Sequence, residues 1–362
     1  MKRILAMAFG GLLGVVLLAG ATLCLTSGCA SIGYFAQSIG GHLSLLQAAR
    51  PVDQWLADAA TGPALRERLL LSQRVRSFAV RELKLPDNRS YRGYADLRRP
   101  AAVWNVVASP ELSLQLKTWC FPVLGCVGYR GYFDRSEADV MAAMLQSQGL
   151  EVMVYGVPAY STLGWSEWLG GDPLLSTFIH FPEGELARMV FHELAHQVAY
   201  ARDDTMFNES FATAVERLGA ERWLEAHAGN DARGEYQRFD LRRSQFRALA
   251  TRYRDALDGL YRGSGADEIK RKRKTELMAA MRVDYLRLKG GEWQGFAGYD
   301  GWFERANNAS FGVLAAYNEL VPAFERLFER EGRDFERFYA EVQRLAALPK
   351  EERRATLAAV TP

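Results

Sequence analysis

The chain has 362 residues, of which 49% are hydrophobic and 24% are charged, and its formal net charge is +2 at pH 7. These proportions are ordinary for a globular protein, and they exclude disordered, collagen-like and coiled-coil proteins. The length allows one large domain or two modest ones. Nucleic-acid-binding domains carry a marked basic excess, so this charge balance predicts no nucleic-acid partner.

The first 28 residues have the pattern of a secretory signal. Lys2 and Arg3 precede an uncharged stretch from Ile4 to Leu25, and small residues follow it. The stretch is long enough to span a bilayer, so an uncleaved anchor is the alternative interpretation. Removing residues 1–28 takes away two basic residues and no acid. The 45 basic residues then fall to 43 and equal the 43 acidic ones.

The end of this segment resembles a bacterial lipobox, in which a cysteine is lipidated as cleavage exposes it. Residues 26–29 read Thr-Ser-Gly-Cys, and Thr26 stands where the lipobox usually has an aliphatic residue. Ala30 follows the cysteine, and the resemblance then implies outer-membrane retention. We therefore expect a mature chain of residues 29–362, anchored through a lipid on Cys29 to the periplasmic face of the outer membrane of a Gram-negative bacterium.

Two further cysteines lie close together in the mature chain. Cys120 and Cys126 are six residues apart and enclose a loop with proline and glycine. In an oxidising periplasm this pair could close the loop, so we predict a disulfide between them. Metal binding by the pair is less favoured because no other cysteine or histidine lies nearby in the sequence. Two reduced core cysteines are the remaining alternative.

Helices and strands alternate in the first half of the mature chain. Hydrophobic periodicity and turn residues predict an amphipathic segment at Ile32–Ala49, helices from Thr61 to about Leu83 and from Ser136 to Gly149, and strands at Ala101–Ala108, Val127–Phe133, Glu151–Val157 and Leu174–Phe181. Ser136 is the expected N-cap of its helix, and Gly149 is the expected closing residue.

The second half is predicted to be almost entirely helical. A helix begins at Pro182-Glu183-Gly184 and runs to about Arg202, and further helices cover Asn208–Ala226, Gly234–Arg262, Asp267–Lys289 and parts of Asn307–Ala359. The basic run Lys270–Lys274 is interpreted as a solvated helix end rather than a binding site for an anionic partner. Strands followed by helices indicate an α+β fold that is predominantly helical.

One short motif carries chemistry, the segment His192-Glu193-Leu194-Ala195-His196. The two histidines are four residues apart, so they share one face of the predicted helix and can point at one ion. Neutral imidazoles at this spacing suit zinc. Glu193 projects about 100° around the helix, so it can take the proton from the water that attacks a carbonyl without acting as a ligand. A helix with two surface histidines is the alternative.

A site with two histidines needs a third ligand, and Glu209, within Asn208–Ala212, is the candidate. This order of motifs resembles the gluzincin metallopeptidases, in which His-Glu-x-x-His is followed by a helix with Asn-Glu-x-x-Ala. The resemblance implies that His192, His196 and Glu209 bind one zinc ion per chain and that Glu193 is the catalytic base. A charge favoured at a helix N-terminus is the alternative explanation of Glu209.

Two departures from that pattern are visible. The interval between His196 and Glu209 is shorter than in the thermolysin-like and large aminopeptidase branches. Thermolysin-like enzymes also place an aspartate four residues after the ligand glutamate to orient a histidine, and Thr213 stands there. A hydroxyl or the carboxylate of Glu216 is then the expected acceptor behind a ligand histidine.

Most of the mature chain resembles a family of bacterial lipoproteins described as putative aminopeptidases. Besides the lipobox and the two metal motifs, the resemblance rests on Gly33-Tyr34, Gln37, Gly40-Gly41, Trp119–Pro122, Gly125-Cys126, Tyr129–Phe133, Asn307–Ala309, Tyr317 and Val321–Phe324. It implies peptide substrates with a free amino terminus, although no residue that would hold that terminus is identified.

Weaker candidates complete the expected site. Hydrolysis develops negative charge on the substrate oxygen, so a donor should face the metal across the substrate. Tyr317 and Asn308 are candidates for that donor, and ordinary packing is the alternative for both. The predicted strand Leu174–Phe181 is a candidate edge for a bound peptide, and a structural strand is its alternative. Tyr129 could line the cleft or simply pack in the core.

The sequence thus predicts a zincin-like catalytic core: strands precede the zinc helix, and a helical C-terminal portion covers the cleft. We expect a mixed region at 29–182, the zinc-site helices at 183–226 and a helical region at 227–362. The predicted function is zinc-dependent peptide hydrolysis in the cell envelope, as an aminopeptidase. The alternatives are an envelope endopeptidase and a non-catalytic lipid-tethered scaffold with a structural zinc.

Overall fold

The computed structural model describes residues 30–121, 125–159 and 171–361. Helices make up 62% and strands 10%, which confirms the predicted α+β class with a predominance of helix. The predicted signal over residues 1–28 and the predicted lipidation site Cys29 lie outside the described residues. None of the helices in the described part is long and apolar enough to cross a membrane.

The strands of the described residues form three small sheets. The first has the order β1-β2-β8, the second β6-β3-β7, and the third is the β4-β5 hairpin. Their bounds are β1 Arg50–Pro51, β2 Gly93–Ala95, β3 Val103–Pro110, β4 Trp119–Phe121, β5 Gly125–Val127, β6 Arg130–Tyr132, β7 Leu150–Val157 and β8 Leu174–Leu175. The β2–β8 pair is parallel, and the other pairs are antiparallel.

The second sheet has a helix on each face. β3 and β7 pair from Val103 opposite Val157 to Pro110 opposite Leu150. Alternate side chains pack against α5 (Arg135–Ser147) in one apolar cluster made of Val106, Ala108, Tyr132, Ala138, Ala142 and Leu145, with Val152 and Val154 beside it. Met153 points to the other face, where it contacts Ser310 of α11 (Asn308–Asn318), because strand side chains alternate.

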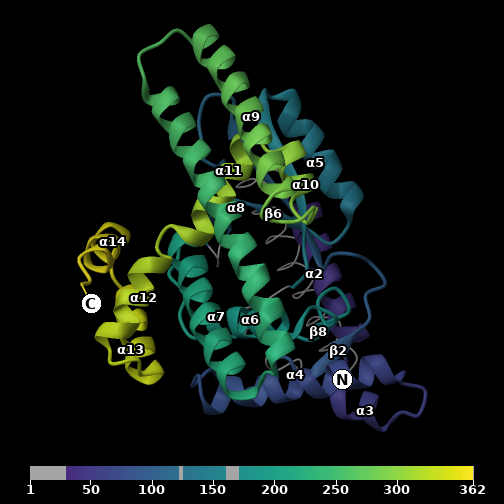
Figure 1. Ribbon diagram of the computed structural model, residues 1–362. Coiled ribbons are helices and arrows are strands. Elements are labelled where there is room, and N and C mark those ends of the chain that lie inside the picture. The colour runs from purple at the N-terminus through teal and green to yellow at the C-terminus, as the bar shows by residue number, and fades with distance from the viewer. Residues whose placement is uncertain (1–29, 122–124, 160–170, 362) are drawn as a thin grey trace, which may run out of the picture.

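Helices form the rest of the molecule (Figure 1). The remaining bounds are α2 Ala30–Ala48, α3 Val52–Ala57, α4 Pro63–Arg81, α6 Glu183–Ala195, α7 Thr205–His227, α8 Asn230–Arg262, α9 Asp267–Gly290, α10 Asp300–Arg305, α12 Val321–Arg330, α13 Phe335–Ala346 and α14 Lys350–Ala358. In Figure 1, α6 and α7 occupy the centre, α12, α13 and α14 gather at one side, and α8 and α9 form a long pair that extends beyond the body.

Two apolar cores hold these helices together. The larger core buries side chains of α4, α6, α7, α12 and α13, including Phe78, Phe191, Phe211, Phe324 and Phe338. The smaller core joins α8, α9 and α10 with the start of α11 through residues that include Phe246, Tyr285, Trp293, Phe303 and Phe311. The larger core therefore surrounds the two helices that carry the predicted ligands.

Two of the predicted strands are wrong in extent. The predicted strand Val127–Phe133 is broken at Gly128-Tyr129, so that β5 pairs in the hairpin and β6 pairs with β3. The predicted strand Leu174–Phe181 is a strand at its first two residues alone. After Leu175 the chain turns, because the N–H groups of Phe178 and Ile179 both donate to the carbonyl of Leu175.

Two predicted helix ends also differ from the structure. The N-cap of α5 is Asp134 instead of Ser136, because the carboxylate of Asp134 accepts a hydrogen bond from the Ser136 N–H at 2.7 Å. Gly149 closes that segment in the left-handed region as expected, with φ of 78°. The helix that begins near Pro182 ends at Ala195 rather than near Arg202.

Candidate metal centre

The first of the two central helices, α6, presents its motif on a well-buried scaffold. Pro182 precedes the helix, and Glu183 and Glu185 lie in its first turn, where carboxylates are favoured by the helix dipole. Leu186, Val190, Phe191 and Leu194 are each fully buried in the larger core. That apolar face fixes the rotation of the helix, so His192 and His196 point toward α7.

The predicted ligands come together around one point. The Nε2 atoms of His192 and His196 are 3.2 Å apart, and one oxygen of Glu209 lies 3.4 Å from the first and 3.5 Å from the second. Ligands bound tetrahedrally at zinc bond lengths lie about 3.3 Å from one another. The three atoms therefore have the spacing of ligands around a single metal ion, and this cluster of His192, His196 and Glu209 could bind a metal.

Charge also suits a cation at this point. Burial raises the pKa of Glu209, but His196 and His192 lower it further, to about 2, so the carboxylate is ionised. Burial lowers the pKa of His192, but hydrogen bonds to Glu209 and Glu216 raise it well above its usual range. A proton on that ring would compete with a metal for Nε2, so the same carboxylates that attract the proton favour a divalent cation.

Glu216 is the hydrogen-bond acceptor behind a ligand histidine, for which the sequence offered either a hydroxyl or this carboxylate. One of its oxygens lies 3.0 Å from Nδ1 of His192, and the other accepts a hydrogen bond from the buried guanidinium of Arg188. Burial raises the pKa of Glu216, but Arg188 and His192 lower it to about 2. By contrast, the buried Nδ1 of His196 has no hydrogen-bond partner among the described residues.

Glu193 lies beside the cluster without joining it. Burial raises the pKa of its carboxyl group, and the nearby His192 and His196 lower it in part. Within the described part of the chain this carboxylate forms no hydrogen bond or ion pair, whereas Glu209 and Glu216 are both engaged. A partly buried carboxylate that is free to accept and release a proton is what a general base requires.

Glu209 reaches the cluster because the chain turns sharply after α6. The side chain of Asn208 accepts a hydrogen bond from the Ala201 N–H at 2.7 Å and donates one to the Ala201 carbonyl at 2.9 Å. These two bonds tie the connection after α6 to the first turn of α7. Asp204 then caps α7 by accepting from the Phe207 N–H at 3.2 Å.

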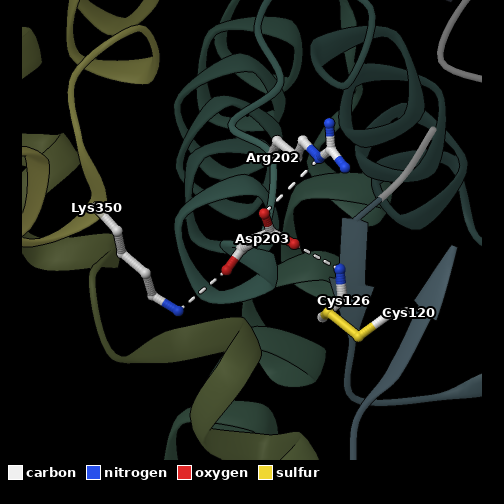
Figure 2. The surroundings of a disulfide bond; sticks show 5 residues. All are labelled: Cys120, Cys126, Arg202, Asp203 and Lys350. Carbon is white, nitrogen blue, oxygen red and sulfur yellow. Dashed lines mark hydrogen bonds and ion pairs between the residues drawn. A yellow bond between two sulfur atoms is a disulfide. The ribbon is translucent and has the colours of Figure 1, made fainter. Parts of the chain in front are cut away.

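Residues that are distant in the sequence hold this turn in place by ion pairs and hydrogen bonds on two sides. Arg353 of α14 donates to Asp204 at 2.8 Å, and Arg354 binds the same carboxylate. On the other side, the N–H of Cys126 donates to Asp203 at 2.6 Å, and Cys126 is joined to Cys120 by a disulfide (Figure 2).

The close approach of the hairpin explains a glycine in it. Gly125 has a φ of 74°, and a Cβ at this position would lie 2.2 Å from a carboxylate oxygen of Asp203. Asp203 itself has a φ of 62°, and its carbonyl accepts a hydrogen bond from Lys350 at 3.0 Å (Figure 2). The α6–α7 connection is therefore held between the disulfide hairpin and the C-terminal helices.

Several side chains near the site were not predicted. Arg188 precedes His192 by four residues, so its position on the same face of α6 was a usable signal. Tyr155 of β7 gave no such signal: burial, together with the charge of Glu209, raises its pKa to about 12. Tyr129, weighed as a cleft residue, also has its pKa raised, by burial and then by Glu209.

The structure describes the side chain of Asn308, one of the two candidate donors from the late motif. Asn308 is fully buried at the start of α11, where its amide donates to the carbonyls of Pro110 and Glu111 at 3.0 and 2.7 Å and its oxygen accepts from Tyr261. These bonds support the packing alternative for Asn308. Tyr317 belongs to α11, but its side chain lies outside the described residues.

The site defines a class of protein in which a three-residue cluster could hold a metal ion and a partly buried carboxylate, that of Glu193, lies beside it. A family model described as "Putative aminopeptidase" matches residues 33–357. That range covers most of the 362 residues, and the chain belongs to this family. Comparisons with curated proteins and with solved structures give no match.

Proposed function

We propose that this protein is a zinc-dependent aminopeptidase of the gluzincin type. The observation that carries the proposal is the triangle formed by the two Nε2 atoms and one Glu209 oxygen, with sides of 3.2, 3.4 and 3.5 Å. The family description, which suggests a peptidase, supports the reaction class. The zincin-like core predicted from the sequence is part of the same proposal.

His192, His196 and Glu209 would hold the zinc ion. Two imidazoles and one carboxylate are a ligand set of catalytic zinc sites, whereas structural zinc sites usually have four protein ligands. When bound, zinc supplies Lewis acidity that polarises a carbonyl and makes water more acidic. The cluster contains three protein ligands among the described residues, and this number favours catalysis over a structural zinc.

Glu193 does the proton chemistry in this proposal. Its carboxylate accepts a proton from the attacking water and then delivers that proton to the nitrogen of the leaving amine. The bond between the carbonyl carbon and that nitrogen breaks as the amine leaves. Glu216 keeps the His192 ring in place during these steps through its bond to Nδ1.

The cell envelope is the proposed location. The lipobox resemblance at Cys29 supports a position on the periplasmic face of the outer membrane, and the disulfide between Cys120 and Cys126 suits that oxidising compartment. The proposed partners are accordingly peptides in the envelope and the membrane itself, through the lipid. No nucleic-acid partner is proposed.

The test measures zinc content and peptide cleavage on the full chain, purified in a mild detergent. We expect one zinc ion per chain and cleavage of peptides with a free amino terminus, but not of the same peptides carrying an N-terminal acetyl group. The Glu193→Gln variant is the matched control, because it preserves the shape of the side chain. It should bind zinc and lose roughly 10²–10⁴-fold in kcat.

Other results would redirect the proposal. Cleavage of acetylated peptides would make the protein an envelope endopeptidase. Stoichiometric zinc without cleavage of either peptide would contradict a peptidase and favour the lipid-tethered scaffold. A folded chain that binds no zinc would overturn the metal centre itself.

A further inference from the structure

A buried arginine lies directly behind the metal cluster. Arg188 is 6% exposed, and it is surrounded by carboxylates from three helices. Glu216 of α7 accepts a hydrogen bond from its Nη2 atom. Glu185 of α6 and Asp240 of α8 lie 3.9 and 4.0 Å from its Nη1 atom. A buried guanidinium is retained only where such partners compensate its desolvation.

The carboxylate of Glu216 connects this arginine to a ligand. Its Oε1 atom binds Arg188, and its Oε2 atom lies 3.0 Å from Nδ1 of His192. An ionised carboxylate can only accept hydrogen bonds, so Nδ1 of His192 must carry the proton of this bond. Nε2, on the opposite side of the ring, is then the atom that would bind the metal ion once a second proton on the ring is displaced.

We propose that Arg188 is a positioning residue for the metal centre: it holds Glu216 in the orientation that fixes His192 with Nε2 facing the metal, and it thereby strengthens zinc binding. This inference rests on the zinc site of the proposed function. The zinc ligands themselves are His192, His196 and Glu209, and Arg188 touches none of them through a hydrogen bond. Its effect therefore passes through Glu216.

His196 lacks the hydrogen-bond support that Glu216 gives to His192. Nδ1 of His196 is buried and has no hydrogen-bond partner among the described residues. The orientation of His196 is consequently set by packing and by the end of α6, whereas that of His192 is set by a charged hydrogen-bond chain. Removing the hydrogen bonds from Arg188 to Glu216 and from His192 to Glu216 should therefore loosen His192.

The hydrogen bonds from Arg188 to Glu216 and from His192 to Glu216 also join two helices. Arg188 and His192 lie four residues apart on α6, and Glu216 lies on α7 seven residues after Glu209, which is close to two helical turns. The carboxylates of Glu209 and Glu216 therefore lie on the same face of α7, one on each side of the His192 ring. Arg188 fastens the far carboxylate and keeps this face aligned with α6.

The test measures zinc affinity by competition with a chromophoric chelator, on the full chain in detergent. Arg188→Met and Glu216→Gln should each weaken zinc binding by about 10–100-fold, the usual effect of losing an outer partner of a ligand histidine. Arg188→Lys should bind zinc more tightly than Arg188→Met, because it restores a charge but not the paired donors. The double variant Arg188→Met/Glu216→Gln should bind no more weakly than Glu216→Gln alone.

Arg243→Met is the matched control. Arg243 is a neighbouring arginine that pairs with Glu185 at 2.6 Å and has a largely buried side chain, but it does not bind Glu216. It should leave zinc affinity unchanged. Thermal unfolding of the metal-free variants checks that each one folds. If Arg188→Met does not fold, a weaker zinc affinity of Arg188→Lys than of the wild type decides the question.

Two results would overturn the inference. The first is wild-type zinc affinity in Arg188→Met or, where that variant does not fold, in Arg188→Lys. The second is a double variant in which the two losses multiply, because Arg188 would then act independently of Glu216. Zinc binding by the wild type without peptide cleavage would contradict the peptidase proposal alone. A wild type that binds no zinc would overturn both.

Discussion

The two histidines and the glutamate of the metal cluster reach the same point by different routes. His192 and His196 are one turn apart on a single helix, so local geometry alone places them side by side. Glu209 arrives on a second helix after a connection that is fastened by residues from the hairpin and the C-terminus. Asp204, in this connection, binds two arginines that lie about 150 residues later in the chain.

The site therefore has a local half, which is His192 and His196 on one helix, and a remote half, which is Glu209 and the α6–α7 connection that places it. The local half needs an intact helix and the support of Glu216. The remote half needs the packed tertiary structure, because no short-range interaction would by itself aim Glu209 at the histidines. Changes that are far from the cluster in the sequence should therefore weaken the glutamate side more than the histidine side, where only the bond from His192 to Glu216 depends on α7.

The largest loss of stability is expected from the buried ion pair between Asp204 and Arg353, which holds the α6–α7 connection. Asp204→Asn removes the charge that compensates Arg353, whose side chain is 5% exposed. Leaving that guanidinium unpaired should lower the free energy of unfolding by about 3–5 kcal/mol. Urea unfolding measures this loss. Asp139→Asn, which breaks an exposed pair with Arg135, is the control and should cost less than about 1 kcal/mol. Equal losses in the two variants would contradict the account.

The same pair predicts how stability depends on acid. Burial raises the pKa of Asp204, but Arg354 and Arg353 lower it further, to below its usual value. A lowered pKa in the folded state contributes stability above the unfolded value of about 3.9, and this contribution disappears as the pH falls through the folded pKa. Unfolding measured from pH 6 to pH 2.5 should therefore show a smaller acid-dependent loss in Asp204→Asn than in the wild type. Parallel profiles would contradict this.

After the Asp204–Arg353 pair, the disulfide hairpin is the second element that holds the α6–α7 connection, through the hydrogen bond from Cys126 to Asp203. Replacing Cys120 and Cys126 together by serine should lower the free energy of unfolding by about 2–4 kcal/mol. It should also free the hairpin from Asp203 and weaken zinc binding through Glu209. Calorimetry and a chelator titration measure the two effects. A variant as stable as the wild type under non-reducing conditions would show that the hairpin does not hold the connection.

A smaller loss is expected from the amide that closes the turn. Asn208→Ala leaves the buried backbone N–H and carbonyl of Ala201 without the partners they have at 2.7 and 2.9 Å. The cost should be about 1–3 kcal/mol. Asn318→Ala, which removes one amide bond to Leu314 on α11, is the matched control. A larger loss in the control than in Asn208→Ala would contradict the role of the turn.

The smallest effect belongs to an exposed neighbour of the same connection. Arg202 lies 3.7 Å from Asp203, but its side chain is 66% exposed. Exposed ion pairs contribute about 0–1 kcal/mol, so Arg202→Ala should unfold at nearly the wild-type urea concentration and bind zinc normally. A loss as large as that of Asn208→Ala would show that charge, rather than the buried hydrogen bonds, fixes the turn.

The sequence predicts the two halves of the site unequally well. Spacing alone aligned His192 and His196, and periodicity placed most helices, because both signals repeat within a few residues. Glu209 is predicted from the need for a third ligand and from the gluzincin resemblance, because no pattern near it in the sequence shows where α7 returns. The predicted end of α6 near Arg202 is wrong, because the N–H groups of Gln197 and Val198 donate to the carbonyls of Leu194 and Ala195 and close the helix there.

The fold shows the same limit. The strand predicted at Leu174–Phe181 has the right composition, but a turn stabilised by backbone bonds to Leu175 replaces most of it. Asp134 was overlooked as a cap because Ser136 has the same propensity two residues later. The spacing of Arg188 and His192 puts both on one face of α6, but the role of Arg188 depends on Glu216, a residue on another helix.

X-ray absorption at the zinc edge of the purified full chain tests the central claim most directly. The account predicts one zinc ion per chain, with nitrogen and oxygen neighbours at about 2.0–2.1 Å and the outer-shell signature of two imidazoles. In His196→Ala that signature should fall to one imidazole or the zinc should be lost. Sulfur neighbours at about 2.3 Å, or a folded chain without zinc, would contradict the assignment of His192, His196 and Glu209 as the metal ligands.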